Sequence, residues 1–224
     1  RGDGAFDDRL LQSVPHTPWF SMGSDTGDLN NDGLIDLFAT DMSATTHYRE
    51  KVMMGNMDTM SWFLDWAEPR QFMRNAVYLN TGTGRMLQAA QLLGVSSTDW
   101  TWTPRLEDFD NDGWLDILAA NGHIDEEINR VQPKVSFKQA PLLFRNNGKG
   151  GFEDVSKTRG ADLMKPIVAR GAAHADYDRA AGAAQKLAPA PVTARPWRPL
   201  SNSASTASCS MRFSLRMMTS GVFN

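Results

Sequence analysis

A nine-residue acidic pattern occurs twice in this 224-residue chain and constrains its fold more than any other feature. Loop 1, residues 28–36, reads D-L-N-N-D-G-L-I-D, and loop 2, residues 108–116, reads D-F-D-N-D-G-W-L-D. In both loops, oxygen-bearing side chains stand at positions 1, 3, 5 and 9, glycine stands at position 6, and an apolar run follows. Two copies of one pattern indicate a fold built from repeated units.

A second pattern alternates with the acidic one. Residues 77–84 and 142–152 are strand-like runs that lead into glycine-rich turns, and short strands of this kind are typical of all-β proteins. The two acidic loops are 80 residues apart, which exceeds the roughly 40–45 residues of one four-stranded propeller blade. Residues 41–76 are therefore expected to form an insertion with short helices at 47–54 and 58–67, and residues 122–140 a second irregular spacer.

The acidic loops are predicted to bind Ca²⁺. Oxygen ligands at alternate positions can converge on one hard cation, and the glycine permits the sharp turn that this requires. A backbone carbonyl at position 7 and the carboxylate at position 9 would complete the shell, a set that suits Ca²⁺ better than Mg²⁺, zinc or copper. The predicted ligands are Asp28, Asn30, Asp32, Leu34 and Asp36 in loop 1 and Asp108, Asp110, Asp112, Trp114 and Asp116 in loop 2.

Two other interpretations of the loops were weighed. An EF-hand needs a bidentate Glu at position 12, where this chain has Ala39 and Ala119. An Asx-rich turn without a metal remains an alternative, although two complete matches in one chain disfavour it. Loop 2 has four carboxylates whereas loop 1 has three and Asn30, so the charge count predicts tighter binding at loop 2.

A third acidic loop begins at residues 174–178 and then stops. Asp176 and Asp178 remain candidate ligands, but positions 180 and 181, where Asp-Gly is expected, are both alanine. Residues 179–224 contain six basic residues, four prolines and no acidic residue. Such a composition is typical of disordered segments. The chain is therefore divided into a partial propeller, 1–178, and an irregular low-complexity tail, 179–224, either disordered or translated from a shifted reading frame.

The acidic loops and their apolar exits resemble the FG-GAP/VCBS repeats of integrin-α-like β-propellers. Further stretches resemble the cartilage-acidic-protein-like family, whose members carry an ASPIC/UnbV domain after the propeller; these stretches are residues 40–48, 74–80, 97–102, 120–123, 141–146, 151–155 and 169–178. The resemblance covers residues 1–178. It implies a calcium-binding β-propeller that is secreted, periplasmic or on the cell surface. Two to three blades do not close a ring, so the chain is expected to be a fragment that lacks the remaining blades.

Several classes of function are not expected. No apolar run approaches the roughly 18 residues that a membrane helix needs, and the single cysteine, Cys209, excludes an internal disulfide and a Cys-based zinc site. The basic residues of the tail have few aromatic neighbours, so a nucleic-acid partner is not expected. The four histidines are scattered, and neither a G-x-S-x-G elbow nor a nucleotide-binding loop occurs.

The sequence therefore predicts an all-β, partial β-propeller with short helical insertions that acts as a binding module and not as an enzyme. Its calcium would be structural, because a bound cation neutralises clustered carboxylates and adds to folding stability. The partner is expected to be a protein or a glycan. Two alternatives stay open: a propeller-based enzyme using groups such as His47, Asp65 or His123, and a truncated gene product without a function of its own.

Overall fold

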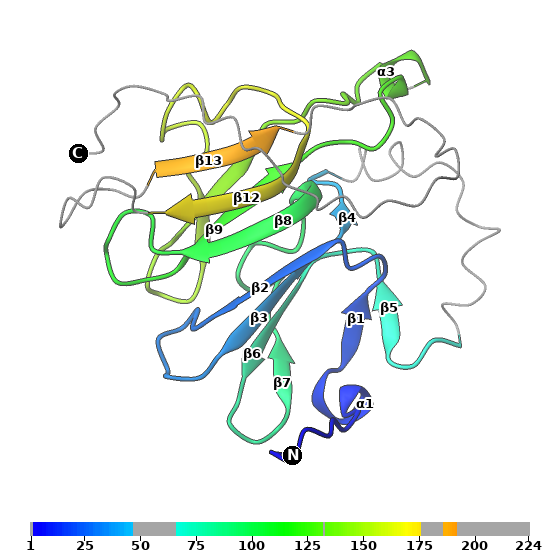
Figure 1. Cartoon of the computed structure of the whole chain (residues 1–224), viewed down its shortest axis with the longest axis vertical. Coiled ribbons are helices and arrows are strands. Elements are labelled where there is room, and N and C mark those ends of the chain that lie inside the picture. Colours follow the sequence, from blue (N-terminus) through cyan, green and yellow to red (C-terminus); the bar gives the residue numbers. More distant parts are fainter. Residues whose placement is uncertain (1, 47–65, 132, 176–185, 192–224) are drawn as a thin grey trace, which may run out of the picture.

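The computed structural model describes residues 2–46, 66–131, 133–175 and 186–191. The expected helix at 47–54 lies outside these ranges, as do nearly all of the one at 58–67 and the candidate ligands Asp176 and Asp178. The described chain is all-β with very little helix, as predicted (Figure 1). Its two helices, α1 (Leu10–Ser13) and α3 (Ile128–Val131), are single turns, and α3 lies in the spacer expected to be irregular. None of the described helices has the length and apolar character required to cross a lipid bilayer.

Four strands form an antiparallel meander that we call blade 1. The strands follow one another in space as in sequence: β2 (Gly23–Gly27), β3 (Asp36–Thr40), β6 (Ala76–Asn80) and β7 (Met86–Gln88). A second meander, blade 2, repeats this arrangement with β8 (Asp99–Glu107), β9 (Asp116–Asn121), β10 (Leu142–Asn146) and β11 (Phe152–Asp154). The register at the loops is the same, since Gly27 pairs with Asp36 and Glu107 with Asp116.

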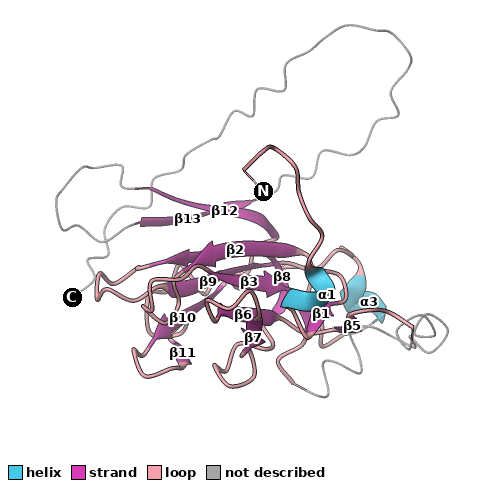
Figure 2. Cartoon of the chain, turned by 90° about the horizontal axis from the view of Figure 1, so that it is seen from below, coloured by secondary structure: helices cyan, strands magenta, loops and turns pink. Residues whose placement is uncertain are grey.

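A third hairpin continues the repetition. Strand β12 (Ala169–Ala175) pairs antiparallel with β13 (Lys186–Pro191), and β12 lies against β8 as β8 lies against β2. Figure 2 shows the outer strands β7 and β11 on one side of the molecule, away from β2 and β12. This arrangement confirms the predicted partial β-propeller. Strand β13 lies inside the predicted tail, and the division of the chain at residue 178 stays a prediction.

The ends of the expected insertion contain short strands. Strand β4 (Met42–Ser43) adds to the edge of blade 2 beside β8, and β5 (Arg70–Phe72) pairs in parallel with β1 (His16–Pro18). Strands of two and three residues are too short to show the alternation by which a strand is recognised in sequence. The expected insertion is thereby tied to blade 2 and to the N-terminal segment.

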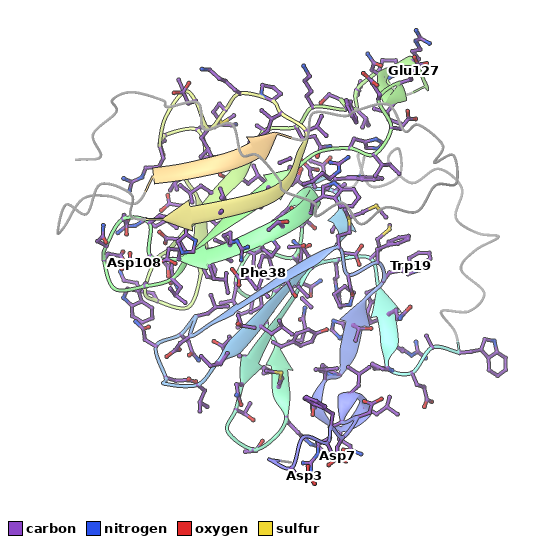
Figure 3. The ribbon with its side chains drawn as sticks, in the orientation of Figure 1. Asp3, Asp7, Trp19, Phe38, Asp108 and Glu127 are labelled. Carbon is purple, nitrogen blue, oxygen red and sulfur yellow. The ribbon has the colours of Figure 1, made fainter. Side chains whose placement is uncertain are left out.

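The two blades share one apolar core. Phe38 and Val77 of blade 1 pack with Ile117 and Phe144 of blade 2, and Figure 3 shows Phe38 between the strands of the two sheets. Close approach of β2 to β8 requires glycine in β2, because a Cβ atom at Gly23 would lie 2.2 Å from the carbonyl oxygen of Trp102. The blades are therefore held face to face, and the hairpin loops 1 and 2 project from the same end of the molecule (Figure 1).

Candidate metal centre

Loops 1 and 2 connect equivalent strands and have the same backbone conformation. Loop 1 joins β2 to β3, and loop 2 joins β8 to β9. The asparagine at position 4 has a positive φ in both loops, 55° at Asn31 and 58° at Asn111, and the glycine at position 6 has 83° at Gly33 and 88° at Gly113. Asparagine and glycine are the residues that adopt this left-handed conformation most readily. The pattern therefore encodes one turn twice.

The carboxylates at positions 1 and 5 hold this turn together. The position-1 carboxylate accepts hydrogen bonds from the backbone N–H groups at positions 5 and 6, at 3.1 and 2.8 Å for Asp28 and at 3.0 and 2.8 Å for Asp108. The position-5 carboxylate accepts one from the N–H at position 7, at 2.9 Å for Asp32 and 3.0 Å for Asp112. Each carboxylate oxygen has further lone pairs, so these bonds leave acceptor capacity for a cation.

The carboxylate at position 9 is buried in both loops. Asp36 is 0% exposed and Asp116 is 2% exposed. Desolvation raises the pKa of both groups, and together with the charges of Asp110 and Asp112 it raises the pKa of Asp116 to about 6. A nearby cation would favour the ionised form of these carboxylates.

The sequence reading missed an asparagine that anchors each position-9 carboxylate. The backbone N–H of Asn80 donates to Asp36 at 2.8 Å, and that of Asn146 donates to Asp116 at 2.8 Å. Each asparagine side chain also accepts a hydrogen bond from a glycine N–H of its own hairpin turn, at 3.0 Å in both blades. The sequence feature that could have identified these residues is an asparagine at the same position in both glycine-rich hairpins, two residues before the glycine of the turn.

The structure gathers three of the predicted ligands of loop 2. Asp108, Asp110 and Asp116 offer carboxylate oxygens that all lie within 4.8 Å of one another. Among the described residues, the Oδ1 atom of Asp110 is buried without a hydrogen-bond partner. A hollow of about 10 Å³ beside Asp110 and Asp116 is roughly the size that one water molecule needs. An all-oxygen donor set with one buried, unpartnered carboxylate oxygen fits Ca²⁺.

The remaining predicted ligands are not gathered in the same way. In the part of the chain that the structure describes, the acidic side chains of loop 1 do not form a cluster as tight as that of loop 2. Asn30 donates a hydrogen bond to Asp32 at 2.9 Å. The backbone carbonyls of Leu34 and Trp114 stay predictions as ligands.

A second missed residue is Arg145 on β10, which reaches into loop 2. Its Nε atom lies 2.8 Å from Oδ2 of Asp110, and its Nη2 atom donates to Oδ2 of Asp112 at 2.9 Å. The hydrogen bond with Asp112 and the charge of Asp110 raise the pKa of Arg145 above its ordinary value. Arg159 lies farther away, 3.8 Å from Asp110. The loop pattern alone contains no sign of this arginine, because it comes from the following hairpin.

The two loops contact each other directly. The side chain of Asn31 in loop 1 donates to the carbonyl oxygen of Gly113 in loop 2 at 2.9 Å. The side chain of Asn146 donates both to Leu29 in loop 1, at 2.9 Å, and to Leu115 in loop 2, at 3.2 Å. Hydrogen bonds therefore join the two loops directly and through Asn146.

Comparison with known protein families agrees with this architecture. Residues 55–119 match the FG-GAP-like repeat, a span that includes β6, β7, β8, loop 2 and the first residues of β9. The chain carries an FG-GAP-like repeat. A search of curated proteins finds no match. The repeat part of the resemblance is thereby confirmed, whereas the ASPIC/UnbV assignment stays a proposal.

Proposed function

We propose that this chain is part of a calcium-binding β-propeller that acts as an interaction module outside the cytoplasm. The observation that carries the proposal is the convergence of Asp108, Asp110 and Asp116 within 4.8 Å in a loop whose backbone conformation occurs twice. FG-GAP repeats are interaction modules and are typical of extracellular proteins, which supports a secreted, periplasmic or cell-surface location.

The role assigned to Ca²⁺ is structural. Asp108, Asp110 and Asp116 would hold the ion, with Asp112 and the carbonyl of Trp114 completing the shell. A bound Ca²⁺ supplies positive charge that offsets the repulsion among these carboxylates. The protein's own contribution is positioning: backbone N–H groups fix Asp108 and Asp116, and the short hairpin loop keeps their oxygens convergent. Loop 1 would hold a second ion through Asp28, Asn30, Asp32 and Asp36.

A binding role fits the described residues better than catalysis. His123, one of the three groups weighed for catalysis, is 3% exposed and its ring lies 4.1 Å from that of Trp100. Burial lowers the pKa of His123, and a substrate in solvent cannot reach this ring. The other two groups, His47 and Asp65, lie outside the described residues. The partner that we propose is a protein or a glycan, and the ASPIC/UnbV family is the proposed parent.

Calorimetric titration of the full chain with CaCl₂ tests the proposal. We expect binding of about two ions with dissociation constants of roughly 10⁻⁴–10⁻³ M, the range of extracellular calcium modules. Asp110→Asn should weaken binding at loop 2 about tenfold. Asp162→Asn is the matched control, because Asp162 is an exposed aspartate that pairs with Lys165 and is not among the predicted ligands. A folded chain that gives no heat at about 10 mM CaCl₂, roughly ten times the weakest expected dissociation constant, would refute the calcium site.

Circular dichroism of the same samples distinguishes a folded calcium-binding chain from a truncated gene product that does not fold. A chain that stays unfolded in both EDTA and CaCl₂ would favour the truncated product without a function of its own. A chain that is folded and gains thermal stability with Ca²⁺ supports the structural role proposed here.

A further inference from the structure

We propose that Arg145 is a built-in counter-cation of loop 2, which competes with Ca²⁺ for the carboxylates of Asp110 and Asp112. The inference rests on the proposed calcium function. The two loops share the nine-residue pattern, and Arg145 is a feature that distinguishes loop 2 from loop 1.

The two blades differ at two equivalent positions in and beside their acidic loops. Position 3 is Asn30 in loop 1 and Asp110 in loop 2. The residue before the anchoring asparagine is Leu79 in blade 1 and Arg145 in blade 2. The additional negative charge of loop 2 therefore occurs together with an additional positive charge, and loop 1 has neither.

Arg145 contacts two of the predicted ligands at the same time. Arg145 lies 2.8 Å from Oδ2 of Asp110 and 2.9 Å from Oδ2 of Asp112, so one guanidinium spans two predicted ligands. The side chains are only 40%, 19% and 26% exposed, respectively. Oδ1 of Asp110 remains buried and without a partner among the described residues. The arginine therefore engages Oδ2 of both carboxylates and leaves Oδ1 of Asp110 without a hydrogen bond.

The charge count of the loops changes when Arg145 is included. Loop 1 carries three carboxylates, and loop 2 carries four carboxylates and Arg145, so both have a net charge of −3 before the more distant Arg159, 3.8 Å from Asp110, is counted. The sequence expectation that loop 2 binds Ca²⁺ more tightly on charge count then loses its basis. A fixed positive charge next to a divalent cation weakens its binding, and the effect decreases as salt screens it.

The experiment isolates loop 2 in the full chain. Asp32→Asn removes one charge from loop 1 while its Oδ1 atom can still accept the hydrogen bond from Leu34, so it serves as the background for all variants. Arg145→Gln is compared with Arg130→Gln. Arg130 is an exposed arginine that pairs with Glu127 at α3, at the opposite side of the molecule from Asp108 (Figure 3).

Two results are expected from Arg145→Gln. Calcium affinity at loop 2 should rise at least about fivefold at low salt and by less in about 0.5 M NaCl, where salt screens charges over a few ångströms. The melting temperature in EDTA should fall by about 2 °C, because Asp110 and Asp112 lose their nearest counter-charge. Arg130→Gln should change neither quantity.

Each other outcome has one meaning. Calcium affinity that stays the same or falls in Arg145→Gln, while the background binds Ca²⁺, would overturn the inference and leave the proposed function intact. If neither protein binds Ca²⁺, the proposed function fails at loop 2. The melting temperature in EDTA then tests by itself whether Arg145 acts as the counter-charge of loop 2. A fall specific to Arg145→Gln would support it, and equal melting temperatures would overturn it.

Discussion

Asn146 is the residue whose removal should most weaken the junction between the blades. Its buried side chain donates to the carbonyl oxygens of Leu29 in loop 1 and Leu115 in loop 2, and it accepts from the N–H of Gly148. Asn80 is its counterpart in blade 1. Among the described residues, the side chain of Asn80 makes two bonds within its own blade, to the carbonyl oxygen of Ile35 at 3.3 Å and from the N–H of Gly82 at 3.0 Å, and both are exposed to solvent.

The expected cost follows from counting these bonds. A hydrogen bond contributes about 0.5–1.5 kcal/mol net, and a buried group left unpaired costs more than an exposed one. Asn146→Ala removes three bonds at a buried site and should lower the free energy of unfolding by about 2–4 kcal/mol. Asn80→Ala removes two exposed bonds and should cost about 1 kcal/mol. The melting temperature should therefore fall by roughly 5–15 °C for Asn146→Ala and by about 3 °C for Asn80→Ala.

Urea unfolding followed by tryptophan fluorescence measures both costs on the full chain. The chain has seven tryptophans, and Trp114 in loop 2 reports on the affected region. The two asparagines occupy the same position in equivalent hairpins, so the difference between the variants reports on the bond from Asn146 to Leu29 together with the greater burial of Asn146. Equal losses for the two variants would show that this bond does not hold the loops together.

Three further predictions follow from burial and close contact. Gly23→Ala should lower the free energy of unfolding by at least about 2 kcal/mol, because its Cβ atom would lie 2.2 Å from the carbonyl oxygen of Trp102. Gly171→Ala is the control, because a Cβ atom at Gly171 would have no heavy atom within 4 Å. It should change the free energy of unfolding by less than about 0.5 kcal/mol in the same urea titration. Burial raises the pKa of Asp41, so the ionised form is disfavoured in the folded state and stability should fall as pH rises from about 4 through the raised pKa. Asp41→Asn should not show this fall in the free energy of unfolding across the same pH range. If the free energies of unfolding of the two proteins change with pH in parallel, Asp41 is not the group responsible. The pKa of about 6 at Asp116 predicts that protons compete with Ca²⁺, so the calorimetric affinity should fall between about pH 7 and about pH 5, roughly one unit on either side of that pKa. An unchanged affinity would argue against Asp116 as a ligand.

The local parts of this structure could be predicted from sequence because their causes are local. The left-handed asparagine and glycine of each loop and the strands on either side follow from residues that are adjacent in the chain. The parts that could not be predicted depend on contacts between distant segments. Arg145 is 33 residues from Asp112, and Asn146 is 117 residues from Leu29. The short strands β4 and β5 likewise form because they find partners in blade 2 and at β1.

The two loops show why a metal site cannot be ranked by its pattern alone. Their backbones adopt the same turn, and their position-9 carboxylates are buried and anchored in the same way. The hairpin that follows, however, has a leucine in blade 1 at the position where blade 2 has Arg145. Because Arg145 holds Asp110 and Asp112 at hydrogen-bonding distance, the fourth carboxylate of loop 2 is already paired when a cation arrives. The electrostatic unit of the proposed calcium site is therefore the loop together with the hairpin that folds onto it, and its charge must be counted over both.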